Sequence, residues 1–374
     1  MIPFNKPFLV GKETEFIQDS VQSGKISGNG IYTQKCQSYF EQRYGFKKAL
    51  LTTSCTDALE MAAILLDIQA GDEVIVPSYT FVSSALAFIR QGAKIVFADS
   101  RSDLPGIDEK TIEELITPRT KAIVIVHYAG VACDMDMIMQ LATQYGIFVV
   151  EDAAQAIDSY FNGQPLGGIG HLGAFSFHET KNIIAGEGGM LTINDERFIE
   201  RSEIVWEKGT NRSAFFKGEI DKYGWVDIGS SFLPSEIIAA FLFAQLEKLD
   251  EIQNRRKEIW QLYYEELEIL ERQEHIQLPY IPEYATNNGH MFYLIVENQS
   301  RRDELLQYLK RNGIHAVFHY ISLHTSEYYL QKNKPNYLPN AERFTQCLIR
   351  LPFFFELEDK EIRFISERIK MFFE

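Results

Sequence analysis

Short runs of aliphatic and β-branched residues alternate, in the first half of the chain, with segments whose apolar positions recur at helical spacing. The runs are apolar at nearly every position, which is typical of strands that are buried on both faces of a sheet. They comprise residues 73–77, 94–99, 122–127 and 147–152. Helical spacing is found between them at 83–90 and 135–145. This alternation predicts an α/β fold with a mainly parallel central sheet flanked by helices.

A helix is predicted from Thr53 to Leu66, and its first residues, Thr53-Ser54-Cys55-Thr56, are typical of a helix N-terminus. Three of the predicted strands end in polar residues: Asp99, His127 and Asp152. Ligands of open α/β sheets bind beyond the carboxyl ends of the strands. We therefore expect the functional site at that edge of the sheet.

The pattern changes after about Pro234, where one long helical stretch runs through residues 258–268 and leads to a second unit. Strands and helices of mixed order follow, which predicts a smaller α+β domain. The expected elements are a strand at 290–296, a helix at 302–312, a strand at 316–320 and a helix at 359–373. A chain of 374 residues also exceeds the length of one ordinary domain. We expect a large cofactor-binding α/β domain over residues 1–250 and a small C-terminal domain over residues 251–374.

Composition and charge narrow the classes of partner. Hydrophobic residues make up 45% of the chain and charged residues 24%, as in an ordinary globular protein. The formal net charge of −15 argues against nucleic acid as a partner. A phosphorylated small molecule stays compatible with that charge, since a helix N-terminus binds phosphate locally.

The cysteines predict neither a metal site nor a disulfide framework. The four residues Cys36, Cys55, Cys133 and Cys347 are scattered and form no CxxC pair. Apolar runs are too short for a membrane span, and residues 1–11 do not resemble a targeting segment. We expect a cytoplasmic protein with free thiols and no membrane partner.

Lys181 is the first candidate for chemistry. It lies in Ser176-Phe177-His178-Glu179-Thr180-Lys181-Asn182, just before the glycine-rich turn Gly186-Glu187-Gly188-Gly189. A confined lysine whose amine is neutral can form an imine with an aldehyde. A solvated surface lysine is the alternative, because that is where most lysines lie.

Asp152 and the helix start at Ser54 are the other two candidates. Asp152 ends a hydrophobic strand 29 residues before Lys181, where a carboxylate can pair with a pyridine nitrogen. A simple helix cap explains such an acid equally well. Free N–H groups at Cys55 and Thr56, together with the Ser176 hydroxyl, would form a phosphate site, although ordinary capping is again the alternative.

Five segments in register resemble the DegT/StrS family of sugar aminotransferases, a branch of the fold-type I pyridoxal 5′-phosphate (PLP) enzymes. The resemblance covers nearly the whole chain. The segments are Thr53-Ser54-Cys55-Thr56, Pro77-Ser78-Tyr79-Thr80-Phe81-Val82, Glu151-Asp152-Ala153-Ala154-Gln155, the Ser176–Asn182 segment and Gly186-Glu187-Gly188-Gly189.

The resemblance implies a role for each matching residue. Lys181 would be the Schiff-base lysine and acid/base, and Asp152 would pair with the ring nitrogen. Phe81 would stack on the pyridine ring and Gln155 would lie near its hydroxyl. The phosphate would be held by Ser176, Thr56 and Cys55, the last through its backbone N–H.

One segment departs from the family pattern. The family usually has Gly-x-Asn-Tyr-Arg, whose Asn reaches the cofactor phosphate of the neighbouring subunit, whereas this chain has Gly229-Ser230-Ser231-Phe232-Leu233. Ser231 is the shorter residue at the Asn position, and Leu233 carries no charge. The resemblance thus implies a homodimer with shared active sites, in which the contact through Ser231 is weaker or is made differently.

Within the family, the chain is similar to the subgroup that makes dTDP-4-amino-4,6-dideoxygalactose for bacterial surface polysaccharides. The similarity includes Ile2-Pro3-Phe4-Asn5, the 127–133 and 207–213 segments, Asp227-Ile228-Gly229-Ser230-Ser231 and Ala316-Val317-Phe318-His319-Tyr320. It implies transfer of an amino group from L-glutamate to the 4-keto carbon of dTDP-4-keto-6-deoxyglucose, without a metal. Candidates for binding the nucleotide sugar are Lys208, Arg212, His319, Tyr320 and His324.

Three alternatives stay open from the sequence. Another nucleotide keto-sugar, linked to a different nucleotide or aminated at C3, would be served by the same catalytic motifs. A PLP-dependent sugar dehydratase is disfavoured by Lys181, because that enzyme has histidine there. A PLP-binding regulator is disfavoured by the paired Asp152 and Lys181 and by the absence of a basic surplus.

Overall fold

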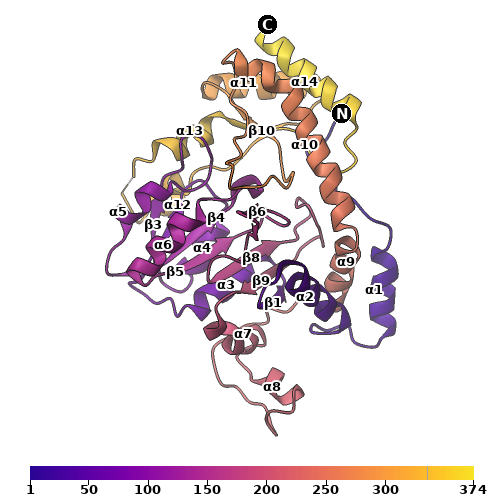
Figure 1. Cartoon of the computed structure of the whole chain (residues 1–374), viewed down its shortest axis with the longest axis vertical. Coiled ribbons are helices and arrows are strands. Elements are labelled where there is room, and N and C mark those ends of the chain that lie inside the picture. Colours follow the sequence, from indigo (N-terminus) through magenta and orange to yellow (C-terminus); the bar gives the residue numbers. More distant parts are fainter. Residues whose placement is uncertain (335) are drawn as a thin grey trace.

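A seven-stranded sheet forms the centre of the larger part of the molecule (Figure 1). The computed structural model describes residues 1–334 and 336–374. In spatial order the strands are β1 (Lys48–Thr52), β9 (Gly189–Ile193), β8 (Leu172–Ser176), β5 (Phe148–Asp152), β4 (Thr120–Val126), β2 (Glu73–Pro77) and β3 (Lys94–Ala98). β9 is antiparallel to both of its neighbours, and the other pairs are parallel. The predicted α/β class with a mainly parallel sheet is confirmed.

Both faces of this sheet are covered, which explains why its strands are apolar at consecutive positions. Along β2, Val74 and Val76 pack into one core while Ile75 packs into the other, and Val149 and Val150 of β5 divide in the same way. The first core includes α3 (Cys55–Leu65), α4 (Ser83–Ile89) and α7 (Ile199–Trp206). The second includes α2 (Ile31–Tyr44), α5 (Ile112–Leu115), α6 (Met135–Tyr145) and α9 (Glu236–Leu246), with α1 (Glu13–Gln22) packed against α9.

The C-terminal part has its own sheet and core. The strand order is β10 (Tyr293–Ile295), β12 (Leu348–Arg350) and β11 (Val317–Phe318). Helices α11 (Gln299–Arg311), α13 (Pro339–Cys347) and α14 (Asp359–Phe373) share this core. The short α12 (Glu327–Leu330) packs instead on the large sheet, through the Tyr329 ring against Phe97 of β3. Figure 1 shows α10, α11 and α14 gathered at one end of the molecule, beyond the large sheet.

The long helix α10 (Leu249–Arg272) packs on both parts. Its first residues, Leu249 and Ile252, belong to a core of the large sheet, whereas Ile259 and Trp260 belong to the C-terminal core. The division at residue 251 would therefore fall in its first turn. We retain the two-domain division as a proposal.

The structure corrects some expected elements. The single long helix expected after Pro234 is two helices, α9 and α10, separated by Glu247 and Lys248. The two differ in character, since α9 is apolar on nearly all sides and α10 has one apolar face. The strand expected at 290–296 is limited to β10. Strands β1, β8 and β9 and helices α1 and α2 were not predicted from the sequence. A small hairpin, β6 (Tyr160–Phe161) with β7 (Gln164–Pro165), lies outside both large sheets.

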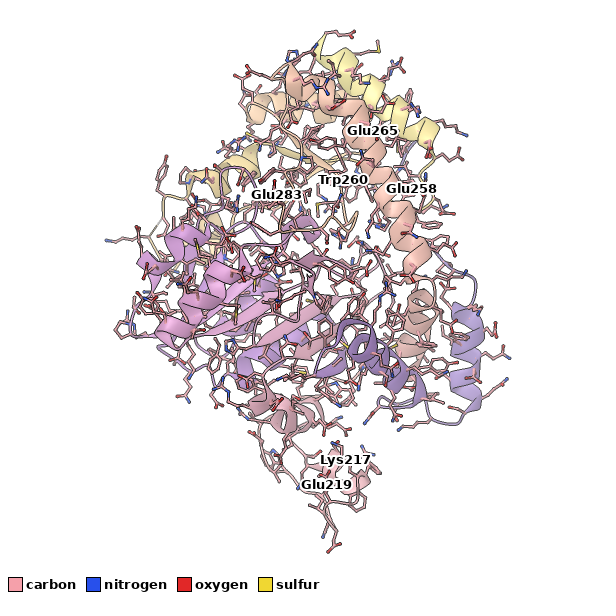
Figure 2. All side chains as sticks on the ribbon, viewed as in Figure 1. Lys217, Glu219, Glu258, Trp260, Glu265 and Glu283 are labelled. Atoms are coloured by element: carbon pink, nitrogen blue, oxygen red, sulfur yellow. The ribbon has the colours of Figure 1, made fainter. Side chains whose placement is uncertain are left out.

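One segment, residues 211–228, extends away from the body of the molecule beyond α7 and contains α8 (Arg212–Phe216) (Figure 1). Figure 2 shows Lys217 and Glu219 far from the central sheet. Its aromatic side chains are exposed, with Trp225 at 85% and Phe216 at 67%. Across the described parts of the chain, none of the helices has the length and apolar character that a membrane crossing requires.

Candidate active site

A cavity of about 460 Å³ lies at the carboxyl ends of β5 and β8. Its lining includes most of the residues that the sequence singled out, which come from segments far apart in the chain. They are Cys55, Thr56, Phe81, Asp152, Gln155, Ser176, Lys181, His319 and Tyr320. The expected edge of the sheet is therefore where these side chains meet.

Asp152 is the last residue of β5 and is only 6% exposed. Its Oδ2 accepts a 2.6 Å hydrogen bond from the Ser84 hydroxyl on α4, and its Oδ1 accepts one of 3.2 Å from the Ala154 N–H. Burial raises the pKa of the Asp152 carboxyl, and these two hydrogen bonds oppose the rise. The carboxylate is thus fixed from behind while it lines the cavity.

The neighbouring carboxylate, Glu151, points away from the cavity and holds the loop between β5 and β8. It accepts hydrogen bonds from the N–H groups of Gly167, Ile169 and Gly170, at 2.7, 2.7 and 2.5 Å. His127 Nε2 lies 3.0 Å from its Oε2. Both Glu151 and His127 are fully buried.

The three polar strand ends therefore have different roles. Asp152 alone of the three lines the cavity. His127 is bound to Glu151, and Asp99 accepts N–H groups of Asn340 and Ala341 at the start of α13. The site lies at the expected edge of the sheet, but Asp99 and His127 do not line it, because each is occupied by backbone or side-chain partners elsewhere.

Lys181 follows β8 in a turn, and its neighbour Asn182 fixes that turn. Asn182 Nδ2 donates to Gln253 Oε1 at 2.8 Å and to the Asn288 carbonyl at 3.0 Å, while its Oδ1 lies 2.7 Å from His290 Nδ1. Burial lowers the pKa of the Lys181 amine. Among the described residues, its amine has no hydrogen-bond acceptor or salt-bridge partner. A neutral amine with no competing partner is suited to nucleophilic attack.

The N-terminus of α3 forms the anion-binding end of the cavity. Ser54 caps the helix by accepting the Asp57 N–H at 3.1 Å, and the N–H groups of Cys55 and Thr56 have no acceptor within the described chain. Thr56 Oγ1 lies 2.7 Å from Ser83 Oγ. A Cβ at Gly189 would lie 2.3 Å from the Ser54 carbonyl carbon, so only glycine lets β9 approach this turn.

Two aromatic rings line the cavity beside this end. Phe81, between β2 and α4, is 55% exposed, and its ring centre is 6.2 Å from that of Tyr320. Gln155 joins them to the loop after β4, since its Oε1 accepts the Ala129 N–H at 2.6 Å and its Nε2 donates to the Tyr320 hydroxyl at 3.2 Å. The exposed Phe81 ring leaves an apolar face available for a flat aromatic ligand.

Three other predicted residues, Lys208, Arg212 and Ser231, line a separate hollow of about 330 Å³. This hollow lies at the base of the projecting segment. Lys25 adds a further cation to it, and Glu207 adds a carboxylate. Within one chain these residues are not part of the Asp152 cavity.

His324 lies in neither hollow. It is 1% exposed, its Nδ1 is 2.6 Å from Ser78 Oγ, and its Nε2 is 3.2 Å from Glu342 Oε1. Both ring nitrogens are occupied by structural partners. The geometry therefore does not support the expectation that His324 contacts substrate, and we leave it out of the proposed site.

Several residues of the cavity were not assigned to the site from the sequence, and two of them, His290 and Arg350, come from the C-terminal part of the chain. Arg350 is the last residue of β12, in a short strand with no recognisable motif around it. His290 reaches the cavity through the turn before β10. Neither residue can be identified from its neighbours in the sequence. Both reach the cavity through tertiary structure, because the C-terminal sheet brings them over the carboxyl edge of the large sheet.

Comparisons with known proteins agree with this geometry. The model of the DegT/DnrJ/EryC1/StrS aminotransferase family matches residues 9–370. The spore coat polysaccharide biosynthesis protein SpsC of Bacillus subtilis is 31% identical over 378 residues, which cover 99% of this chain and 96% of SpsC.

Solved structures have the same fold. The candidate sugar aminotransferase Spr1654 of Streptococcus pneumoniae, in its PMP form, superposes with a TM-score of 0.91 at 28% identity, covering 99% of this chain and 98% of that one. That protein has also been solved in a PLP form. DesV of S. venezuelae, in complex with a ketimine intermediate, gives 0.91 at 31% identity, covering 100% and 98%. With a family model that spans nearly the whole chain and relatives of this identity and coverage, the chain belongs to the DegT/DnrJ/EryC1/StrS aminotransferase family.

Proposed function

We propose that the chain is a PLP-dependent aminotransferase that acts on a nucleotide-linked keto-sugar. The observation that carries the proposal is one cavity that brings together the buried carboxylate of Asp152, the amine of Lys181 and the N-terminus of α3. Within the described chain, the Lys181 amine and the first N–H groups of α3 have no partner. PLP, when bound, supplies an aldehyde and an electron-withdrawing ring for moving an amino group between two carbon skeletons.

The residues of the cavity fit that cofactor. The Cys55 and Thr56 N–H groups and the hydroxyls of Thr56 and Ser176 suit a phosphate dianion. Asp152 suits a protonated pyridine nitrogen, which it would stabilise as a carboxylate. The open face of Phe81 suits the ring itself, and Gln155 would contact the ring hydroxyl.

Lys181 would act both as the nucleophile and as the general acid/base that moves the proton. Burial favours its neutral amine, so nitrogen is available for attack on an aldehyde. With the cofactor bound and an incoming amine in its place, the freed Lys181 nitrogen would remove the proton from the Cα of the amino donor in the first half-reaction. It would deliver a proton to the acceptor carbon in the second. Asn182 would keep the lysine backbone in place through its three hydrogen-bonded neighbours.

The acceptor we propose is dTDP-4-keto-6-deoxy-D-glucose, with L-glutamate as donor and dTDP-4-amino-4,6-dideoxy-D-galactose as product. The resemblance to that subgroup supports this choice, as does the family membership. His319 and Tyr320 line the cavity and would contact the sugar, whereas Lys208 and Arg212 would contact a diphosphate from the second hollow. The amino sugar produced would be used in the synthesis of bacterial surface polysaccharides.

The functional unit we propose is a homodimer with shared sites. The projecting segment, residues 211–228, exposes aromatic rings that a monomer would leave in water, among them Trp225 and Phe216. A second copy would cover these rings and bring Ser231, Lys208 and Arg212 toward the Asp152 cavity of its partner. The two hollows, separate within one chain, would then form one site.

The decisive experiment is a substrate panel. Purified protein with PLP and L-glutamate is incubated with 4-keto and 3-keto sugars linked to dTDP, UDP or GDP, and products are identified by mass and by the proton couplings at C4. An axial amine on the dTDP-linked 6-deoxyhexose is expected. A gluco product rejects the proposed configuration, and a 3-amine or another nucleotide rejects the proposed acceptor. No product with any keto-sugar, together with no response of the bound cofactor to glutamate, favours a PLP-binding regulator.

A further inference from the structure

Among the residues that the structure describes, the Arg350 guanidinium has no anionic partner. Arg350 ends β12 and lines the Asp152 cavity. No salt bridge or hydrogen bond of its side chain occurs among the described residues, and its Nε is buried without any acceptor. The guanidinium lies over the ring of Phe4, with its carbon 4.8 Å from the ring centre. A buried donor without an acceptor is costly, so this arrangement favours a ligand that supplies one.

The other basic groups near Arg350 do not compete for such a ligand. His290 and His319 line the same cavity, but each has Nδ1 in a hydrogen bond, to Asn182 and to the Tyr128 hydroxyl. Burial lowers the pKa of both imidazoles well below the usual range, so both are neutral. Burial also favours the neutral amine of Lys181, so among the described residues that line the cavity Arg350 is the one permanent cation.

We infer that Arg350 binds the α-carboxylate of the amino donor, and this rests on the proposed aminotransferase function. The carboxyl carbon of an amino acid is two bonds from its nitrogen, so a donor whose nitrogen reacts where Lys181 does must place its α-carboxylate in the same cavity. A guanidinium forms two parallel hydrogen bonds with a carboxylate. These bonds would fix which face of Cα meets Lys181.

A diphosphate is the other anion that the proposed reaction brings to this protein. In a nucleotide sugar with a 4-keto group, the diphosphate is attached at C1, across the ring from the reacting carbon. It therefore lies farther from Lys181 than the α-carboxylate of a donor does. Lys208, Arg212 and Lys25 in the second hollow supply three cations for such a group. The segment 229–233 supplies no cation, since Leu233 is uncharged.

Three amines separate the contributions of the two donor carboxylates. L-Glutamate has both, 4-aminobutyrate lacks the α-carboxylate, and L-2-aminobutyrate lacks the γ-carboxylate. The rate of cofactor conversion is measured with each amine for the wild type, Arg350→Gln and Arg350→Lys. We expect Arg350→Gln to lower kcat/KM for both α-carboxylate donors about a hundredfold and to change that for 4-aminobutyrate less than threefold. Arg350→Lys should lie between, because a single ammonium lacks the fork of the guanidinium.

A binding measurement gives a readout that does not depend on turnover. The dissociation constants of 2-oxoglutarate and of dTDP are measured by calorimetry with the PLP-loaded protein. Arg350→Gln should weaken 2-oxoglutarate about a hundredfold and leave dTDP within twofold. Arg363→Gln, a surface arginine on α14 paired with Glu266, is the matched control and should match the wild type in both assays. Thermal melting of each variant verifies that the fold is intact.

The outcomes are distinct. If Arg350→Gln leaves the ratio of kcat/KM for L-glutamate to kcat/KM for 4-aminobutyrate unchanged, the assignment is overturned. A weaker affinity for dTDP with an unchanged affinity for 2-oxoglutarate also overturns it, because that result assigns Arg350 to the diphosphate. If Arg350→Gln lowers the rate for L-glutamate and 4-aminobutyrate alike but not for L-2-aminobutyrate, Arg350 binds the γ-carboxylate. That result also overturns the assignment to the α-carboxylate. If the wild-type cofactor responds to none of the amines, the proposed aminotransferase function fails, and this inference fails with it.

Discussion

The Ser84 hydroxyl on α4 donates a 2.6 Å hydrogen bond to Oδ2 of Asp152 at the end of β5. Ser84 is itself fully buried, and its Oγ lies 2.9 Å from Thr80 Oγ1. The carboxylate that faces the cavity is therefore held by a helix on one side of the sheet, independently of any ligand. Because this hydrogen bond favours the ionised form, Ser84 helps to keep Asp152 charged despite its burial.

Ser84→Ala should move the acid limb of the pH profile to higher pH. Loss of the donor raises the pKa of Asp152 further, so the carboxylate is protonated over more of the acidic range. Activity near pH 8 should fall less than tenfold, while the loss should grow as pH is lowered. The measurement is kcat/KM against pH, with the exposed Ser300→Ala as control. Parallel profiles for the two variants would argue against this role of Ser84.

Asp152→Asn should leave the fold intact and reduce the rate about a hundredfold or more, because a neutral amide does not stabilise a protonated ring nitrogen. Asparagine keeps the size of the side chain and retains an oxygen for the Ser84 hydroxyl. Steady-state rates and the urea unfolding midpoint separate the two effects. A rate within about threefold of the wild type, which is less than about 1.4 kcal/mol of barrier, is incompatible with the proposed role.

The residues of the cavity that the sequence identified share a local signature. Asp152 ends a predicted strand, Cys55 and Thr56 begin a predicted helix, and Lys181 precedes a glycine-rich turn, so each is marked by its immediate neighbours. Strand β2 and helix α6 were predicted with the bounds that the structure has, since their apolar patterns are bounded by clear turn residues. Local pattern was sufficient wherever one segment determines its own position.

Residues placed by tertiary packing were not predictable in this way. Arg350 reaches the cavity only because β12 lies between β10 and β11 over the large sheet, and the three short strands have weak patterns. Strand β8 was missed because Gly173 interrupts its apolar run. That glycine is required where the Gly167 carbonyl approaches, since a Cβ there would lie 2.3 Å from its oxygen. His324 shows the opposite error, because its polar character reflects a buried hydrogen bond to Ser78.

Lys181→Ala should abolish amino transfer while cofactor binding persists. The N–H groups of α3, Asp152 and Phe81 are unaffected by the substitution, so the phosphate and ring contacts remain. The visible absorbance that borohydride bleaches in the wild type should be lost, and free PLP should still be retained on gel filtration. Wild-type turnover together with a borohydride-reducible bond at another lysine would refute the assignment.

Glu73 should contribute to stability above about pH 5. Burial would raise the pKa of its carboxyl, but hydrogen bonds from Thr117, Arg119 and Lys94 lower the pKa to about 2. A lowered folded-state pKa stabilises the protein above the unfolded value, and this contribution is lost as pH falls from about 5 to 2. At about 1.4 kcal/mol per pKa unit, the shift from 4.5 to about 2 corresponds to at most about 3.5 kcal/mol.

Urea unfolding of Glu73→Gln at several pH values measures this contribution. The variant should be less stable than the wild type at pH 7, and the difference should shrink steadily toward pH 3. Glu114→Gln, at an exposed position on α5, is the control and should show no such trend. A difference that stays constant with pH would mean that Glu73 acts through packing and not through its charge.

The final prediction concerns the proposed sharing of sites between subunits. Ser231→Glu would place a negative charge where we propose that the segment faces the cofactor phosphate of the partner, so this variant and Lys181→Ala should each be inactive alone. In a mixed dimer, the Ser231→Glu chain supplies an intact Lys181 cavity and the Lys181→Ala chain supplies an intact Ser231. One complete site results.

Random exchange of equal amounts gives about half mixed dimers with one working site of two, so about a quarter of wild-type activity should return. Mixing Lys181→Ala with Asp152→Asn is the matched control. Those two changes affect the same cavity, and each cavity of their mixed dimer keeps one of them, so no activity should return. Differently tagged chains establish by pull-down that exchange has occurred. Exchange without recovery in the first mixture, or an active monomer by light scattering, would show that each chain completes its own site, and Ser231 would then have to act within one subunit.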